Sequence, residues 1–205
     1  MFDSERPEVY EAVYEGLVGR LAGADLKQAA QDLGLAWEAG RTRVTLLGRE
    51  YLVGPAGVEA ADGAGVPFTH RIVLAYYLLQ GGRGEAAGRF VPYRELSGGA
   101  DFARNMAITV EGRIAAFFSG HPDRLLRAAL ALDGRAAHTQ VKADLALDFD
   151  ALPKLPLRLT FFDADEDFPA ESKLFYDLLC TNFLDLECLA ALGLILARDL
   201  ERAAA

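Results

Sequence analysis

Val141-Lys-Ala-Asp-Leu-Ala-Leu-Asp148 alternates apolar with mostly polar residues, and Leu155-Pro-Leu-Arg-Leu-Thr-Phe161 repeats the alternation after six further residues. A period of two is typical of a strand that turns one face to the core and the other to water. Pro156 has no backbone N–H, so the second strand should lie at an edge, or Pro156 should lie at the start of that strand. The six-residue connection contains Pro153 and predicts that the two strands form an antiparallel pair.

Apolar residues at helical spacing predict helices on both sides of this strand pair. They indicate an N-terminal helix through Tyr10, Val13, Tyr14, Leu17 and Leu21, a buried helix over 72–79, a helix with the stripe Phe102, Met106, Val110, Ile114, Phe117 and Phe118, another after Pro122, and a final one capped by Asp185. We interpret His70, near the start of the buried helix, as a capping or packed residue. Two β-rich runs, 43–47 and 50–53, flank Gly48 and predict a hairpin, followed by a polar loop over 54–65.

Helices mixed with antiparallel strands, without sustained β-α-β alternation, indicate the α+β class. We expect an antiparallel sheet of a few strands packed by several helices, in a single domain over residues 1–205. Within it, the helical and hairpin part should cover 1–60, the central helices 67–134, and the C-terminal strands and helix 139–203.

Composition narrows the classes of partner. The formal net charge is −9 and the pI about 4.9, so we expect neither nucleic acid, which requires clustered Lys and Arg, nor an anionic membrane surface. The first residues do not resemble a signal peptide, and no apolar run approaches the ~20 residues of a membrane span. The two cysteines, Cys180 and Cys188, fit a reducing cytosol and are too few to hold an iron–sulfur cluster or close a zinc site. We therefore predict a cytoplasmic protein without a cofactor.

The second strand runs into a dense group of acids, Phe161-Phe-Asp-Ala-Asp-Glu-Asp-Phe-Pro169. Such density costs repulsion unless a cation, N–H donors or open water relieves it, so the stretch is either a site or a solvated turn. As a calcium loop counted from Asp163 it lacks the required glycine and the final glutamate, but a looser divalent-metal site on Asp163 and Asp165 stays open. An aspartate nucleophile in a D-x-D motif and a glycosidase-like acid pair are further alternatives. In a turn, Asp167 would accept backbone N–H groups and Phe168 would plug the core.

An ordered set of motifs extends over most of the chain. It includes Leu47-Gly-Arg-Glu-Tyr51, Leu74-Ala-Tyr-Tyr-Leu-Leu79, Val91-Pro-Tyr-Arg-Glu-Leu-Ser-Gly-Gly99, Asp165-Glu-Asp-Phe-Pro-Ala170 and Leu174-Phe-Tyr-Asp177. The set resembles an uncharacterised prokaryotic family, found largely in anaerobes and archaea, that is known only as domain-of-unknown-function family 3786. The chain departs from the family pattern where His, Gly and Asp are usual, at Tyr76, Ala164 and Cys188. The resemblance implies no established activity.

Some members of that family carry a four-cysteine iron–sulfur domain ahead of this one. The resemblance therefore implies a setting in anaerobic redox or corrinoid metabolism, with an iron–sulfur or corrinoid protein as partner. Two hypotheses follow, and they leave open whether the protein is an enzyme. The first is a non-catalytic binding or accessory protein that could form a homodimer. The second is an enzyme or ligand-binding protein with a metal ion on Asp163 and Asp165 and a ligand held by Tyr93, Arg94, Asp165, Glu166 and Asp177.

Overall fold

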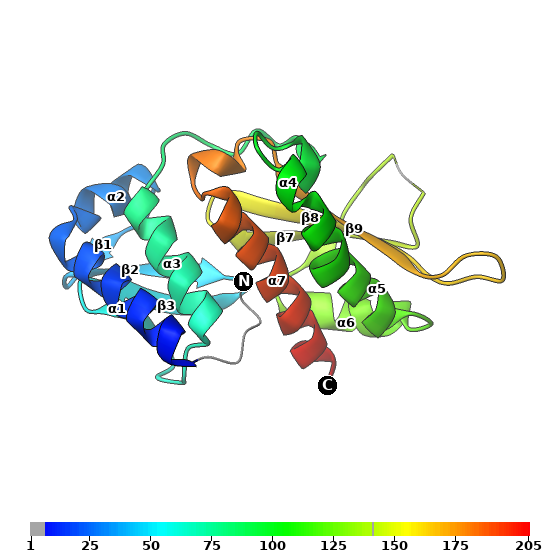
Figure 1. The fold of residues 1–205 in the computed structure, drawn as a ribbon, viewed down its shortest axis with the longest axis horizontal. Coiled ribbons are helices and arrows are strands. Elements are labelled where there is room, and N and C mark those ends of the chain that lie inside the picture. Colours follow the sequence, from blue (N-terminus) through cyan, green and yellow to red (C-terminus); the bar gives the residue numbers. More distant parts are fainter. Residues whose placement is uncertain (1–6, 141) are drawn as a thin grey trace.

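Two antiparallel sheets, each covered by helices, form the two lobes of the molecule (Figure 1). The computed structural model describes residues 7–140 and 142–205. The first lobe contains α1 (Pro7–Gly23), α2 (Leu26–Asp32), β1 (Trp37–Glu38), β2 (Arg41–Leu46), β3 (Arg49–Gly54), β4 (Gly57–Ala60) and α3 (Phe68–Gln80). The second contains β5 (Phe90–Pro92), η1 (Tyr93–Glu95), α4 (Ala100–Met106), η2 (Ala107–Glu111), α5 (Gly112–Phe118), α6 (Pro122–Ala131), β6 (Arg135–Ala136), β7 (Leu145–Leu152), β8 (Leu155–Phe162), β9 (Glu171–Asp177), η3 (Cys180–Asn182) and α7 (Leu186–Ala204). The α+β class is confirmed, with two sheets where we expected one.

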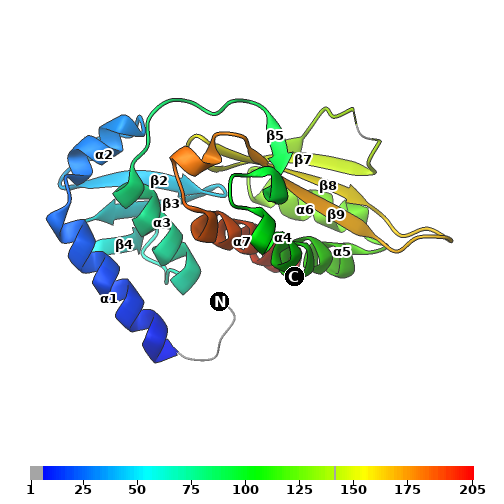
Figure 2. The same cartoon turned by 45° about the horizontal axis from the view of Figure 1, so that its top comes forward.

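Helix α7 connects the two lobes. The sheets have the strand orders β1-β2-β3-β4 and β5-β9-β8-β7-β6, and α7 packs against α3 of the first lobe and against α5 and α6 of the second (Figures 1 and 2). Leu189, Leu192 and Leu196 on α7 are fully buried, and buried side chains of both lobes form one continuous apolar core. Within the described residues, none of the helices combines the length and apolarity needed to cross a bilayer.

The hairpin predicted around Gly48 is confirmed as β2 and β3. Leu47 and Gly48 have φ values of 48° and 77°, and two central residues with positive φ are the turn that matches the twist of a hairpin. The expected loop over 54–65 is wrong in part, because β4 pairs with β3 inside it. A Cβ at Gly57 would lie 2.5 Å from the Tyr14 hydroxyl, so the glycine lets the strand pass close to α1.

The strand pair predicted from its alternation is β7 and β8, with Leu147 opposite Leu159. Val141 lies outside the described residues, and the strand begins at Leu145. β7 has the expected eight residues but lies four positions further along the chain, so the turn is confined to the two residues 153–154, of which Lys154 has a φ of 65°. Pro156 lies near the start of β8, beside a register shift in β7, and β8 itself is a central strand.

The long helix predicted through Phe102 and Phe118 is interrupted by a π-helical turn. This turn, η2, separates α4 from α5 and inserts an extra residue that rotates one helix relative to the other. Met106 and Val110 are buried as expected, whereas Phe102 is 37% exposed. On α1, Val13 is 48% exposed because it lies at the margin of the buried stripe.

Candidate functional site

The acidic stretch forms the tip of the β8–β9 hairpin, which extends away from the body of the molecule (Figure 1). One oxygen of Asp165, Oδ1, accepts hydrogen bonds from the backbone N–H groups of Asp167 and Phe168, at 2.9 and 2.8 Å. Asp163 Oδ1 accepts from Gly120 N and Ala164 N, at 2.7 and 2.9 Å. Asp165 therefore closes the turn at the tip, where we had expected Asp167 to accept the N–H bonds, and Asp163 connects the end of β8 to Gly120 in the loop after α5.

The expectation that Phe168 plugs the core is wrong. Its side chain is 70% exposed, because the turn closed by Asp165 lies beyond the last pair of β8 and β9, Phe162 and Glu171. Glu166 is also exposed. The tip thus presents an aromatic ring and several carboxylates to solvent.

Asp177, at the opposite end of β9, is fully buried. Its Oδ1 accepts from Ala87 N and Leu179 N, both at 2.9 Å, and its Oδ2 accepts from Gly88 N at 2.7 Å. Three backbone donors compensate the buried charge, so Asp177 fastens the loop after α3 to the second sheet. The length of β9, about 20 Å at a strand's rise per residue, separates Asp177 from the tip.

Tyr93 and Arg94 lie in a third place, on η1. Tyr93 is buried, donates its hydroxyl hydrogen to Leu186 O at 2.6 Å and packs edge-on against Tyr176. Arg94 is exposed at a cleft beside α4. The predicted ligand-binding residues are therefore not brought together. Among the described residues, no group of three or more His, Cys, Asp and Glu side chains is arranged to hold a metal ion.

A pocket of about 330 Å³ lies where the two lobes meet, and sequence reasoning missed it. Four segments form it, namely the end of the β2–β3 hairpin, the start of α3, and the ends of α6 and α7. We call it the junction pocket; its lining is Leu46, Leu47, Arg49, Tyr51, Pro67, His70, Leu132, Asp199, Arg202 and Ala203. The hairpin turn is fixed beside the second lobe because Leu47 N donates to Ala151 O at 3.0 Å.

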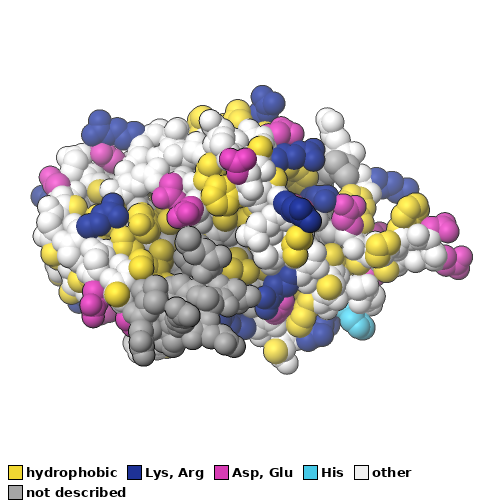
Figure 3. Space-filling view, viewed as in Figure 1, with side chains coloured by type: hydrophobic (Ala, Val, Ile, Leu, Met, Phe, Trp, Pro, Cys, Tyr) yellow, Lys and Arg dark blue, Asp and Glu magenta, His cyan; other side chains and the backbone are white. Residues whose placement is uncertain are grey.

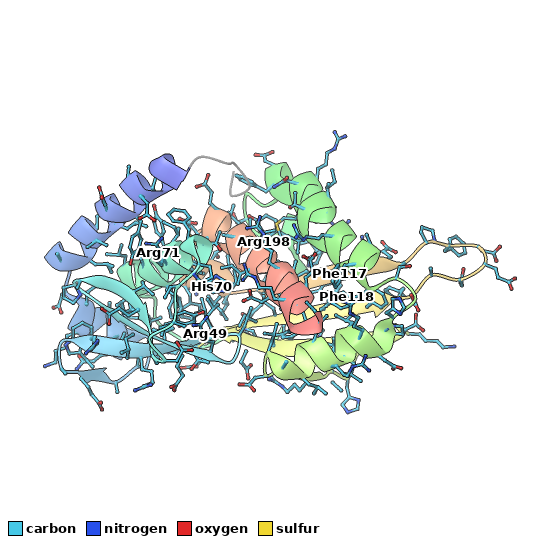
Figure 4. All side chains as sticks on the ribbon, turned by 90° about the horizontal axis from the view of Figure 1, so that it is seen from below. Arg49, His70, Arg71, Phe117, Phe118 and Arg198 are labelled. Atoms are coloured by element: carbon cyan, nitrogen blue, oxygen red, sulfur yellow. The ribbon has the colours of Figure 1, made fainter. Side chains whose placement is uncertain are left out.

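A histidine from one lobe and an aspartate from the other meet in this pocket. His70 Nε2 lies 3.0 Å from Asp199 Oδ2, and the two side chains are 5% and 15% exposed. Figure 4 labels His70 on α3 and Arg198 on α7, the helix that carries Asp199. The second oxygen, Oδ1, accepts from the Arg202 guanidinium at 2.8 Å. The other ring nitrogen, His70 Nδ1, is buried and has no hydrogen-bond partner within the described residues. A buried polar atom without a partner costs about 1–3 kcal/mol, so a retained one indicates a role beyond packing.

Arg49 and Tyr51 form the opposite wall of the junction pocket. The Arg49 guanidinium lies 5.4 Å from the centroid of the Tyr51 ring and pairs with Asp62 at 3.2 Å. The Ala64 N–H and Arg49 lower the pKa of Asp62, whereas burial, and then the charge of Asp199, raise the pKa of Tyr51. Both arginines of the lining are paired, Arg49 with Asp62 and Arg202 with Asp199, but each guanidinium has further N–H donors that can bind an anion.

Two signals in the sequence lead toward this pocket. Leu47, Arg49 and Tyr51 belong to the Leu-Gly-Arg-Glu-Tyr motif on which the family resemblance rests. His70 is packed, as interpreted, but its partner Asp199 is 129 positions away in the chain. No local pattern connects the two.

Comparison with known proteins gives one result. A family model described as "Domain of unknown function (DUF3786)" matches residues 25–199. The matched range includes both members of the His70–Asp199 pair, and Arg202 lies beyond it. No match was found among curated proteins or among solved structures.

Proposed function

The chain belongs to the DUF3786 family of domains of unknown function, and on that premise we propose that it is a non-catalytic binding protein that holds a small organic anion in the junction pocket. A volume of about 330 Å³ lies within the range of small-molecule sites, which often occur where two parts of a protein meet. Leu46, Pro67 and Leu132 form apolar walls that can contact the hydrocarbon part of such a ligand. The two arginines can bind its negatively charged group.

The observation that carries the proposal is the His70–Asp199 pair. It joins α3 of one lobe to α7 of the other across the pocket wall, so a molecule in the pocket lies against both lobes. A ligand seated against both lobes would add contacts that an empty pocket lacks, and it would thereby favour the closed junction.

The same geometry favours binding over catalysis. A general acid or base must lie within hydrogen-bond reach of its substrate. His70 Nε2 already faces Asp199, and the imidazole is 5% exposed, so a molecule in the pocket meets the arginines and the Tyr51 edge before it meets a free ring nitrogen. A setting in anaerobic redox or corrinoid metabolism, beside an iron–sulfur or corrinoid partner, is part of the proposal, and its support is the family resemblance.

The test is ligand-dependent stabilisation. Inorganic phosphate, succinate and benzoate serve as probes that differ in charge and apolar body, with sodium chloride at equal ionic strength as the control. A ligand present at 100 times its Kd stabilises by about 2.7 kcal/mol, which corresponds to a rise in Tm of roughly 5–10 °C for a chain of this size. At least one probe should produce such a rise.

Matched variants locate the effect. Arg49→Ala and Arg202→Ala should abolish the rise in Tm, whereas Arg43→Ala, which removes another exposed arginine of the first sheet outside the pocket, should retain it. The proposal fails if no probe exceeds the sodium chloride control, or if the rise in Tm is equal in all three variants.

A further inference from the structure

A second cleft, of about 440 Å³, lies between η1, α4, η2 and β9. We call it the basic groove; its lining is Pro92, Tyr93, Arg94, Ala103, Arg104, Met106, Ala107, Glu111, Lys173 and Phe175. Tyr93 and Met106 are buried beneath the groove, and the Phe175 side chain in its lining is half-buried. The junction pocket shares none of these residues, so the groove is a separate feature.

The groove is positively charged on a chain whose net charge is −9. Its lining contains three cations and one carboxylate, a local charge of +3 − 1 = +2, and Lys173 also pairs with Glu171, outside the lining, at 2.8 Å. Glu111 is occupied, because one oxygen accepts from Leu174 N at 3.1 Å and the other lies 3.5 Å from Lys173. Glu95 and Asp101 lie on η1 and α4, two of the elements that form the groove, but they are not part of its lining.

Two of the cations have nothing to neutralise them. Arg94 and Arg104 are exposed, and within the described residues neither makes a side-chain ion pair or hydrogen bond. By contrast, Arg43, Arg135 and Arg158 each pair with a carboxylate at 2.7 Å. Unpaired arginines beside an apolar surface suit a ligand that combines carboxylates with a hydrophobic group.

The helix beside the groove also exposes apolar residues. The π-helical turn η2 contributes Ala107 and Glu111 to the lining, and Ile108 within it is 64% exposed. Phe102 on α4 is 37% exposed. π-Helical turns often occur at functional sites, where they present side chains that a regular helix would turn away.

The β8–β9 tip has the complementary composition. Phe168 is 70% exposed and follows Asp165, Glu166 and Asp167, and the turn is held by the hydrogen bonds of Asp165. Figure 3 shows acidic and hydrophobic side chains together at the protruding end, and Lys and Arg side chains gathered over the region of α4. A preformed tip loses little conformational freedom on binding.

We propose that the basic groove receives the β8–β9 tip of a second copy of this chain. Phe168 would contact the half-buried Phe175 above the buried Tyr93 and Met106, and the acids around it would face Arg94 and Arg104. In both views of the ribbon the tip extends away from α4 (Figures 1 and 2). The tip therefore points away from the groove of its own chain, and it can bind the groove of another copy. Because the tip directly precedes β9, and Lys173 and Phe175 lie on β9, a two-fold axis can place each tip in the other groove.

Sedimentation equilibrium tests the proposal, at protein concentrations up to about 1 mM and at low and high salt. We expect a monomer–dimer equilibrium that weakens as salt rises. The double variant Arg94→Glu, Arg104→Glu and the single variant Phe168→Ala should each lower the association constant at least tenfold. Arg127→Glu on α6 is the matched control, because this arginine is exposed and likewise has no side-chain partner within the described residues.

Charge exchange separates a direct contact from general repulsion. Glu166→Lys with Asp167→Lys should weaken association, and the same pair combined with Arg94→Glu and Arg104→Glu should restore it. Exchanging Glu166 and Asp167 leaves Asp165 unchanged, and the carboxylate of Asp165 is the one that closes the turn. A fluorescent peptide of residues 163–171 should bind the wild-type monomer and not the Arg94→Glu, Arg104→Glu variant.

Three results would overturn the proposal. The protein could remain a monomer at about 1 mM in low salt; it could associate with a constant that the groove and tip variants leave unchanged; or the charge exchange could fail to restore the association. Circular dichroism and Tm of each variant identify those that fail to fold, and the peptide then tests the groove with the tip of the protein left intact.

Discussion

Acids lie at both ends of β9, and the two ends differ in what surrounds them. At the tip, Asp165 accepts N–H groups two and three residues further along the chain, in a turn that water surrounds. At the other end, Asp177 is fully buried and accepts two N–H groups from a loop about 90 positions away in the sequence. Water can replace the hydrogen bonds of the tip but not those of Asp177. The density of acids in a sequence therefore marks a solvated turn here, and a single buried acid holds the tertiary structure.

The largest effect should come from Asp177. We expect Asp177→Ala to lower the free energy of unfolding by roughly 3–5 kcal/mol, because it leaves three backbone N–H groups of a buried site without an acceptor. Asp177→Asn should cost less, since its amide oxygen can still accept. Urea denaturation measures both, and a loss below about 1 kcal/mol for the alanine variant would show that water reaches the site.

The neighbourhood of Asp177 should also make the protein sensitive to alkali. Burial, with the charge of Asp177 as the next contribution, raises the pKa of Cys180 from 9.0 to about 12. The unfolded chain therefore loses this proton at a lower pH than the folded one, so the contribution to stability is present below pH 9 and is lost as the pH rises toward 12. One such thiol should cost about 1.4 kcal/mol by pH 10.

Urea denaturation at pH 8, 9 and 10 checks this expectation. The free energy of unfolding should decline less steeply with pH in Cys180→Ala than in the wild type. Part of the decline should remain in this variant, because burial also raises the pKa of Cys188. An identical decline in the wild type and in Cys180→Ala would rule out the assignment to Cys180.

A smaller effect is expected at the tip. Asp165→Ala should lower the free energy of unfolding by about 0.5–1 kcal/mol, the range of an exposed side chain that caps backbone N–H groups. Glu166→Ala is the matched control, because the Glu166 carboxylate makes no hydrogen bond within the described residues, and it should leave stability unchanged. A loss from Asp165→Ala as large as that from Asp177→Ala would remove the contrast between the two ends of β9.

The smallest effect concerns the two phenylalanines that flank the acidic stretch. Phe168→Ala should change the free energy of unfolding by less than about 0.5 kcal/mol, since the ring is 70% exposed. Phe161→Ala, at a fully buried position on β8, should lose about 3–5 kcal/mol and provides the reference. A large loss from Phe168→Ala in the monomer would mean that the ring packs onto the chain after all.

Features that depend on neighbouring residues were predictable from the sequence. Asp185 was expected to cap the final helix, and its carboxylate accepts from Cys188 N at 2.8 Å. The β2–β3 turn follows from Gly48 between two β-rich runs, and β7 and β8 follow from their alternation. Strand β4 was missed because a short run containing Gly57 carries no period.

The candidate site was predictable only in fragments. Arg49 and Tyr51 were noticed within a motif and His70 as a packed residue. The acids predicted to form a site, Asp163 and Asp165, instead accept backbone N–H groups, from Gly120 and from the hairpin turn respectively. The reason is separation along the chain. His70 meets Asp199 only because α3 and α7 pack together.

The amino-acid sequence alone determined the α+β class, the family, the helix caps and the main hairpins, because periodicity, capping and turn chemistry act over a few residues. Tertiary structure decided that there are two sheets, that Phe168 faces water, that Asp177 is buried, and that a pocket forms around His70 and Asp199. Burial and the meeting of distant side chains depend on how the elements pack, and no local pattern encodes that packing.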